Sequence, residues 1–335
     1  MKLDPAIAEG LGVDPAHTTL SSAGGGGCSS ASNAKITTTF SDGRTRSWFM
    51  KSAQGSKGRA MLEGEHASLL ALSTASPTLV PRPHALGTLS SSPTTHFLLT
   101  SFLTLSSAPR SPATPSLATK LARLHSTPAP NPPRFGFSRP TYCGDTAQDN
   151  AWDPSWESFF RERRLGAILR ACEENNGADA ELRALVERTQ REVCGRLIGD
   201  GHLNGGEGVV PVVVHGDLWS GNWGRGRVER GEGGKGEFEE GEVHEVAYDP
   251  SAAYAHGEFD HGIMKMFGGF GAGFWEEYWA VVEKTEPVEE YEDRVELYEL
   301  YHHLNHNALF GGSYRSGAVS IMKKLLRKYG KKEMI

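Results

Sequence analysis

Two short apolar runs near the N-terminus have the β-branched and aromatic composition of paired strands. Residues 34–40 (AKITTTF) and 45–50 (TRSWFM) flank Asp42-Gly43, and Asp-Gly is a strong hairpin signal. Residues 59–72 then carry leucine, methionine and alanine at helical spacing, and prolines end this segment before a short strand at 96–99. The pattern therefore predicts a small antiparallel sheet with one helix in residues 1–103.

The pattern changes after residues 104–116, which are rich in Ser, Thr and Pro as linkers are. Apolar positions beyond this point mostly follow helical periods, and a pair of strands interrupts them, 209–214 before His215 and 243–248 before Asp249. We expect helices over residues 117–124, 156–172, 179–196, 274–284, 289–309 and 318–329. The sequence thus predicts an α+β chain of two lobes, with a small lobe at 1–103 and a larger, mostly helical lobe at 104–335.

Composition narrows the class of protein. The 335 residues are 38% hydrophobic and 23% charged, which suffices for a sizeable core, and the net charge of −6 argues against nucleic-acid and anionic-membrane partners. No apolar stretch approaches the roughly 18 residues of a membrane span, and the N-terminus lacks a signal-peptide pattern. Four cysteines without CxxC spacing indicate free thiols, so we expect a cytoplasmic protein.

Glycine is unusually frequent, with 40 residues, and part of the excess lies in a low-complexity insert at 225–241. This insert alternates Gly, Glu and Arg and has almost no apolar residue. Because burial cannot offset its ordering entropy, we expect a mobile loop there.

The strongest chemical motif is the segment HGDLWSGN at 215–222. It has the H-x-D-x-x-x-x-N spacing of a kinase catalytic loop, in which an aspartate reaches the attacking hydroxyl and an asparagine reaches a Mg²⁺ ion beside the phosphates. Asp217 and Asn222 occupy these two positions. Asp249, after the next strand, is the candidate for the second metal-binding carboxylate.

The small lobe supplies candidates for a phosphate clamp. Gly24 to Gly27 can bring backbone N–H groups close to phosphate oxygens, Lys51 ends a strand, and Glu65 on the following helix can fix this lysine by an ion pair. Each feature alone is common on protein surfaces. Together with the catalytic loop and Asp249, however, they occur in the order found in kinases.

Several segments carry a family resemblance. The chain resembles the fructosamine-3-kinases, also called ketosamine-3-kinases, which are similar in fold to aminoglycoside and choline kinases. Trp219 and Ser220 inside HGDLWSGN separate this family from those relatives. The other matching segments are MLEGEHASLL (61–70), RFGFSRPTYCGD (134–145), WDPSWESFFRERRLG (152–166), YDPSAAYAHGEFDH (248–261), MKMFGGFG (264–271), Asn305-His306 and FGGSYRS (310–316).

The resemblance implies a bilobal protein-kinase-like fold and a particular reaction. This is ATP-dependent phosphorylation of the sugar 3-hydroxyl of ketosamines, the ribulosamine or fructosamine adducts on lysines or free amines, with Mg²⁺ as cofactor. The unstable 3-phosphate then decomposes and releases the amine, which amounts to deglycation and protein repair. The expected partners are therefore ketosamine small molecules or glycated proteins.

The resemblance also implies residue roles. Asp217 is the catalytic base, Asn222 and Asp249 hold Mg²⁺, and Trp219 and Glu258 lie near the sugar. The nucleotide-binding set comprises Gly24, Gly25, Gly26, Gly27, Lys51, Glu65, Thr100 and Phe102, the last two in a hinge segment beside adenine.

The chain departs from the family pattern at Gly24–Gly27, a plainer glycine run than usual, and at Ala255 and His261. Because of the last two changes, the resemblance does not determine which residues line the substrate pocket. The insert at 225–241 is a further departure, although loop-closure entropy grows only slowly with length. The sequence does not separate ribulosamine from fructosamine preference. Two alternatives remain, namely a related kinase for an aminoglycoside, choline or another sugar, and a catalytically silent nucleotide-binding protein.

Three lesser features have two interpretations each. Cys28 is a small loop residue or a redox-sensitive thiol, so we expect a monomer or a redox-linked dimer. His302, His303 and His306 have spacing that can bind zinc, although no supporting carboxylate or cysteine follows. The basic positions between Lys323 and Lys332 form a solvated helix face or a docking site for an acidic protein.

Overall fold

The structure is a computed structural model, and it describes residues 3–23, 31–130, 133–229, 238 and 241–331. The chain divides into two compact units, the first comprising Met1–Leu121 with Gly221–Pro250 and the second Ala122–Ser220 with Ser251–Ile335. This division differs from the predicted boundary after residue 103. The reason is that strand 103–105 and the later strands of 221–250 join one sheet of the first unit.

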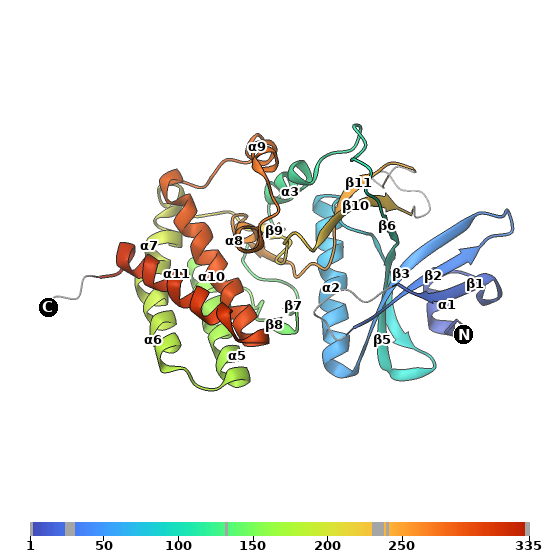
Figure 1. The fold of residues 1–335 in the computed structure, drawn as a ribbon, viewed down its shortest axis with the longest axis horizontal. Helices are drawn as coiled ribbons and strands as arrows, with labels where there is room; N and C mark the ends of the chain where they lie inside the picture. The colour runs from blue at the N-terminus through green and yellow to red at the C-terminus, as the bar shows by residue number, and fades with distance from the viewer. Residues whose placement is uncertain (1–2, 24–30, 131–132, 230–237, 239–240, 332–335) are drawn as a thin grey trace. The chain divides into compact units, whose positions relative to one another are not determined.

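The first unit contains a five-stranded antiparallel sheet of order β1-β2-β3-β5-β4 (Figure 1). The predicted hairpin is confirmed, because β2 and β3 pair from end to end and Thr39 lies opposite Thr45. Helix α2 packs against β3 and β5, and α1 packs against β4. The elements are α1 (Pro5–Leu11), the 3₁₀ turn η1 (Pro15–His17), β1 (Thr18–Ser22), β2 (Ser32–Thr39), β3 (Thr45–Gln54), α2 (Gly55–Ala75), β4 (Pro83–Leu89) and β5 (Ser92–Ser101).

A second, three-stranded sheet of this unit has the order β11-β10-β6 and consists of β6 (Leu103–Leu105), β10 (Trp223–Val228) and β11 (His244–Ala247). The expectation of a mobile loop over 225–241 is therefore wrong for its first residues, which form β10. Phe238 is also buried, with 5% exposed, against Val228 and Val246. The low-complexity composition hid these few apolar contacts, which hold part of the insert to the sheet.

The two strands predicted beside the catalytic loop do not pair with each other. Instead β9 (Val212–Val214) pairs with β12 (Ala253–Ala255), and β11 pairs with β10. A further short strand pair, a hairpin, consists of β7 (Thr141–Cys143) and β8 (Thr146–Gln148). The sequence pattern identified strands 209–214 and 243–248, but pairing partners depend on contacts between distant segments.

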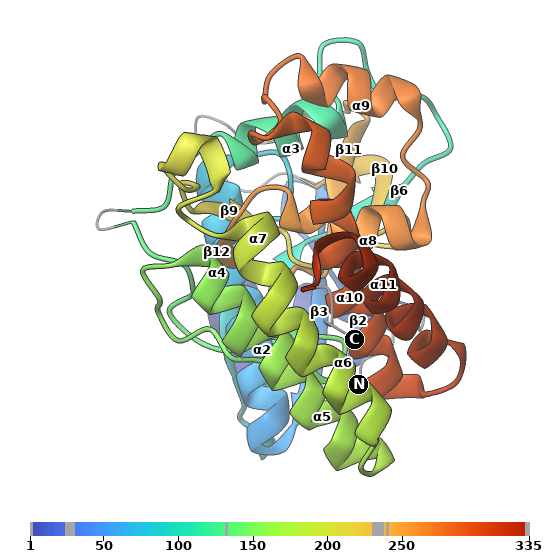
Figure 2. The ribbon, with the colours of Figure 1, turned by 90° about the vertical axis from the view of Figure 1, so that its left-hand side faces the viewer.

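Helices dominate the second unit, in which α10 packs against α5, α8 and α11 (Figures 1 and 2). Their core includes Trp156, Phe159, Phe160 and Tyr298, each with 0% exposed. Among the described residues no helix has the length and apolar character needed to span a membrane. The helices are α3 (Leu117–His125, which begins in the first unit), α4 (Trp156–Ser158), the π-helix η2 (Phe159–Gly166), α5 (Ala167–Asn176), α6 (Ala180–Thr189), the π-helix η3 (Gln190–Cys194), α7 (Gly195–Ile198), η4 (Leu203–Gly206), α8 (Phe259–Phe267), α9 (Ala272–Trp279), η5 (Val288–Glu290), α10 (Tyr291–Phe310) and α11 (Ser313–Tyr329).

Candidate active site

Lys51, Glu65 and Asp249 meet in the first unit. Lys51 Nζ donates to both carboxylate oxygens of Glu65 at 2.8 Å and to Asp249 Oδ1 at 2.7 Å. The Lys51 and Glu65 side chains are 11% and 18% exposed, whereas that of Asp249 is 42% exposed. The ion pair predicted between strand β3 and helix α2 is therefore present, and the Asp249 carboxylate remains open to solvent.

Electrostatics keep this lysine charged. Burial alone would lower the pKa of Lys51, but the charges of Glu65 and Asp249 hold it above its ordinary value. Burial raises the pKa of Glu65, and the neighbouring ammonium opposes that rise. A lysine that is charged and fixed by two carboxylates is suited to bind a phosphate oxygen.

The two candidate metal ligands stand at the same end of the strand pair β10–β11. Trp223 lies opposite Ala247, and one residue beyond this pair the Tyr248 N–H donates to the Asn222 carbonyl oxygen at 3.0 Å. Asp249 follows with φ 56°, a left-handed conformation that costs a non-glycine residue about 1–3 kcal/mol. An amide and a carboxylate suit Mg²⁺, which takes oxygen ligands and keeps several waters and substrate phosphates.

The two residues predicted near adenine occupy different positions. Thr100 lies inside the five-stranded sheet, opposite Phe49 and Pro83. Phe102 stands between β5 and β6, its carbonyl oxygen accepts from the Glu229 N–H at 2.9 Å, and its ring lies 4.2 Å from the Lys35 ammonium. Contact with adenine stays a prediction for both residues.

The catalytic loop in the second unit is held by a buried carboxylate. Asp260, in the first turn of α8, accepts from the backbone N–H groups of His215 at 2.8 Å and Gly216 at 2.7 Å. His125 Nε2 lies 3.1 Å from the same carboxylate, and His125 Nδ1 lies 2.7 Å from the Tyr278 hydroxyl. Asp260 thus fixes the backbone that presents Asp217.

Sequence reasoning missed Asp260, although it lies in the matching segment 248–261. Burial alone would raise the pKa of Asp260, but hydrogen bonds and nearby His125 lower it. A single aspartate in a helix has no local signature, and its role depends on a loop 44 residues away.

Gly216 is required by the turn that precedes Asp217. Its φ is +82°, and a Cβ atom there would lie 2.1 Å from the Ser251 carbonyl oxygen. Asp217 itself is half-buried, and its Oδ1 lies 3.6 Å from the Cys143 sulfur. The catalytic loop therefore has one tight backbone turn and one partly open carboxylate.

Trp219 and Glu258, both predicted near the sugar, have different surroundings. The Trp219 ring packs against Phe267 at 5.3 Å, and Phe267 packs against His306 at 5.1 Å. Because Phe267 is 37% exposed, this aromatic row reaches the surface of the second unit.

Glu258, in contrast, lies in the interior. It is 4% exposed, and its oxygens accept from Arg294 Nε at 2.7 Å, from Arg294 Nη2 at 3.1 Å and from the Thr285 N–H at 3.0 Å. These contacts give Glu258 a structural role in the helical unit, so we do not include it in the proposed substrate site.

Other predicted positions lie outside the described residues or in the core. Gly24 to Gly27 and Cys28 fall outside the described residues. Ala255 is buried in β12, and His261 is buried among Trp275, Tyr278, Trp279 and Tyr291. Both departures from the family pattern are therefore changes of core packing.

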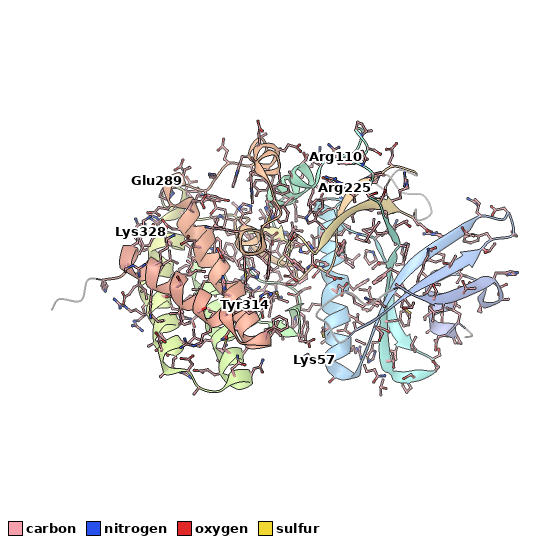
Figure 3. All side chains as sticks on the ribbon, in the orientation of Figure 1. Lys57, Arg110, Arg225, Glu289, Tyr314 and Lys328 are labelled. Carbon is pink, nitrogen blue, oxygen red and sulfur yellow. The ribbon has the colours of Figure 1, made fainter. Side chains whose placement is uncertain are left out.

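The structure shows the surroundings of the two C-terminal features. Within the described ranges no group of three or more His, Cys, Asp or Glu side chains is arranged to hold a metal ion. The structure therefore does not support a zinc site at His302, His303 and His306. Three basic side chains of α11, among them Lys328 (Figure 3), pair with neighbouring acids. Lys323 pairs with Glu181, Lys324 with Glu296, and Lys328 with Asp293.

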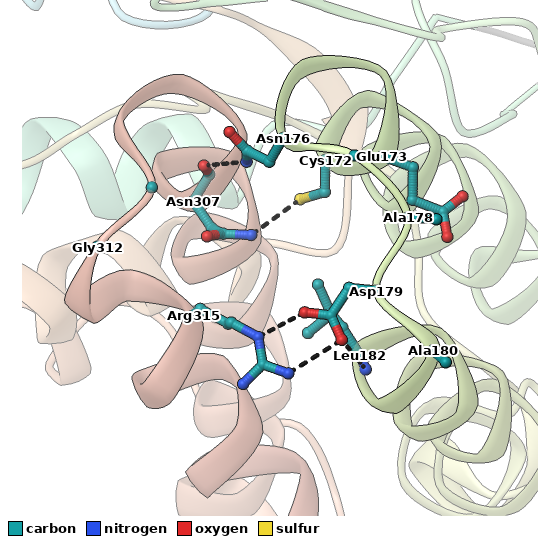
Figure 4. Close-up of a pocket in the computed structure, with 12 residues that line it drawn as sticks. Cys172, Glu173, Asn176, Ala178, Asp179, Ala180, Leu182, Asn307, Gly312 and Arg315 are labelled. Carbon is teal, nitrogen blue, oxygen red and sulfur yellow. Dashed lines mark hydrogen bonds and ion pairs between the residues drawn. The ribbon is translucent and has the colours of Figure 1, made fainter.

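A hollow of about 480 Å³ lies between the α5–α6 connection and the α10–α11 connection (Figure 4). Several of its polar groups bind one another. Arg315 pairs with Asp179, and Asn176 donates to the Asn307 carbonyl oxygen. It contains none of the predicted site residues. The hollow therefore remains separate from the candidate chemistry.

Solved structures with a similar fold define the fold class. A candidate fructosamine-3-kinase from Thermobifida fusca has a TM-score of 0.71 at 22% identity. The match covers 97% of this chain and 98% of the Thermobifida fusca chain. An aminoglycoside phosphotransferase APH(4)-Ia variant, in ternary complex with ADP and hygromycin B, has a TM-score of 0.53 at 12% identity, with 96% and 98% covered. The predicted α+β, kinase-like fold class is thus confirmed.

Sequence comparison defines the family. A model of the fructosamine kinase family matches residues 7–328. The rice (Oryza sativa subsp. japonica) "Protein-ribulosamine 3-kinase, chloroplastic" is 32% identical over 335 aligned residues, with 96% of this chain and 86% of the rice protein covered. The mouse (Mus musculus) "Ketosamine-3-kinase" is 32% identical over 192 residues, with 57% and 54% covered. The chain belongs to the fructosamine kinase family.

Proposed function

We propose that this protein is an ATP-dependent ketosamine 3-kinase that phosphorylates the 3-hydroxyl of ribulosamine or fructosamine adducts. The observation that carries the proposal is family membership over residues 7–328. It is supported by the residue types that phosphoryl transfer uses, namely Lys51, Glu65, Asn222 and Asp249 in the first unit and Asp217 in the second. The relatives' names supply the substrate class, and ADP in a structure of the same fold supports the choice of nucleotide.

In the proposed reaction Asp217 accepts the proton of the sugar hydroxyl. The hydroxyl oxygen forms a bond to the γ-phosphorus, and the bond from that phosphorus to the ADP oxygen breaks. Lys51, held by Glu65 at 2.8 Å, binds phosphate oxygens and offsets their charge. Catalysis then comes from positioning and charge neutralisation, because phosphoryl transfer needs little covalent chemistry from the protein.

The residues present fit a magnesium ion. Asn222 and Asp249 offer an amide and a partly exposed carboxylate, and these would hold Mg²⁺ together with nucleotide phosphates and water. The ion would neutralise charge on the transferring phosphoryl group. Asp249 also binds Lys51 at 2.7 Å, so the metal ligand and the phosphate-binding lysine share one position on the first unit.

The sugar is proposed to lie beside Trp219. The row formed by Trp219, Phe267 and His306 offers apolar ring faces, which suit the C–H groups of a sugar and the alkyl chain of its amine. The released 3-phosphate would decompose to free the amine, so the activity would count as deglycation. The rice and Arabidopsis relatives are named chloroplastic, and a cytoplasmic location, like a monomer or redox-linked dimer, remains a prediction here.

A phosphorylation assay with ribulose-lysine, fructose-lysine, an aminoglycoside and choline tests the proposal. We expect Mg²⁺-dependent ATP consumption with one or both ketosamines, and a fall of about 10²–10⁴-fold in kcat for Asp217→Asn. Asp149→Asn, which removes a half-exposed carboxylate paired with Arg163, is the matched control and should keep normal kcat. Turnover of only the aminoglycoside or choline, or near-normal turnover by Asp217→Asn, would contradict the proposal.

A further inference from the structure

A buried thiol lies directly behind the proposed catalytic base. Cys143 is the last residue of β7 and is 1% exposed. Its sulfur is 3.6 Å from Asp217 Oδ1, although the two residues are 74 positions apart. Asn305 on α10, also 1% exposed, places its Nδ2 3.2 Å from the same sulfur and 3.3 Å from the Cys143 carbonyl oxygen. Three segments of the second unit therefore meet at the Cys143 sulfur.

The chemistry of these groups fixes the direction of the hydrogen bonds. An amide nitrogen only donates, so the sulfur accepts from Asn305, and its own proton is left to point at the carboxylate. Burial, with the negative charge of Asp217, raises the pKa of Cys143 well above its ordinary value, so the thiol is a neutral donor. The other ionisable groups around it are Arg164 on η2 and Tyr301 on α10.

We propose that Cys143 is a positioning residue for Asp217. Its S–H group holds Oδ1, Oδ2 receives the proton of the sugar hydroxyl, and Asn305 orients the thiol. This proposal rests on the proposed function, in which Asp217 is the base. Asp260 fixes the backbone of the catalytic loop. The thiol contacts the Asp217 carboxylate itself, and it therefore adds a restraint on the direction of Oδ1.

A thiol suits this task because it is a weak donor. Lysine or arginine at this place would neutralise the carboxylate and lower its basicity, and a strong hydroxyl donor at 2.5–2.7 Å would do so in part. A weak hydrogen bond restricts the rotamer while the carboxylate retains most of its ability to take a proton. The contact is buried on the Cys143 side and half-open at Asp217, as a carboxylate that must meet a substrate requires.

Cys143→Val tests the proposal, because valine is apolar, has no donor and adds only one heavy atom to the side chain. We expect kcat to fall about 5–10-fold, as loss of one weak hydrogen bond in the transition state implies, while the KM for ATP stays within twofold. The acidic limb of the kcat–pH profile should move about 0.5 pH unit upward, because the carboxylate loses a donor that favours its charged form. Cys143→Ser keeps a donor, and a hydroxyl donates more strongly than a thiol, so that limb should not move upward in this variant.

Cys172→Val is the matched control. Cys172 is also buried, but its sulfur contacts the Leu304 carbonyl oxygen and Asn307. Its variant should therefore keep the wild-type kcat and pH profile. Urea unfolding of every variant separates loss of fold from loss of turnover.

Asn305→Leu provides a second route if Cys143→Val does not fold. It should lower kcat in the same direction. Unchanged kcat and pH profile in Cys143→Val, or equal changes in Cys172→Val, would overturn the positioning role while Asp217→Asn still reports on the base. If Asp217→Asn itself keeps normal turnover, the proposed function fails instead, so the two failures are distinguishable.

Discussion

The buried carboxylate of Asp260 is expected to support both stability and turnover. It is fully buried and accepts three hydrogen bonds, two from the catalytic-loop backbone at 2.7 and 2.8 Å and one from His125 at 3.1 Å. Asp260→Asn keeps the shape of the side chain but replaces one accepting oxygen by an amide that only donates. In either orientation of the amide, at least one backbone N–H of His215 or Gly216 then faces another donor.

The size of the effect follows from this contact. A buried donor left without an acceptor costs about 1–3 kcal/mol, and the new amide group adds a second unsatisfied donor. We therefore expect the free energy of unfolding to fall by about 2–4 kcal/mol. Because the affected N–H groups immediately precede Asp217, kcat should fall about 10-fold or more even at temperatures where the variant is fully folded.

Urea unfolding and steady-state kinetics with a ketosamine substrate measure the two effects. Glu181→Gln is the control, because Glu181 forms exposed ion pairs with Arg315 and Lys323, and such pairs contribute about 0–1 kcal/mol. If the free energy of unfolding of Asp260→Asn lies within about 0.5 kcal/mol of the wild-type value, the reasoning about unsatisfied buried donors is refuted. If it is unstable yet keeps normal kcat, the link between this anchor and the catalytic loop is refuted.

Three further predictions concern single contacts. Gly216→Ala should fold poorly and lose turnover, because φ is +82° and the added Cβ would lie 2.1 Å from the Ser251 carbonyl oxygen, and a soluble variant with normal kcat would contradict this. Lys51→Met should raise the Kd for ATP about 10-fold or more by calorimetry, since it removes the ammonium that the structure holds between two carboxylates, and an unchanged Kd would remove Lys51 from the nucleotide site. Hydrogen bonds from Ser91 and Ser90 lower the pKa of Asp4 to about 2 against the effect of burial, so its contribution to stability is present above its unfolded pKa and is lost as the pH falls toward 2. The stability difference between wild type and Asp4→Asn should therefore shrink between about pH 4 and pH 2, and a difference independent of pH would refute this.

Local pattern predicted the β2–β3 hairpin and helix α2 of the first unit, but it did not indicate α1, β1 or β4. Strands at 34–40 and 45–50 and the helix at 59–72 rest on side-chain periodicity and on one Asp-Gly turn, which are interactions between near neighbours. The ion pair between Lys51 and Glu65 was also predictable, because the two residues lie fourteen positions apart on a strand and the helix that follows it. The spacing of Asp217 and Asn222 likewise indicated a catalytic loop, since chemistry demands those residue types at that distance.

Contacts between distant segments account for what the sequence did not indicate. Composition identified the insert after Asn222 as a loop, yet pairing of β10 with β6 and β11 places its first residues in a sheet. The sequence placed Glu258 near the substrate. In the structure both of its carboxylate oxygens accept from Arg294, which lies 36 positions away along the chain.

The sequence alone therefore determined the α+β class, the order of the kinase parts and the identity of the candidate base. The tertiary structure decided which buried groups support that base, because Asp260, Cys143 and Asn305 come from separate elements and carry no local signature. A hydrogen bond depends on distance in space, and only folding sets the distance between residues that lie tens of positions apart.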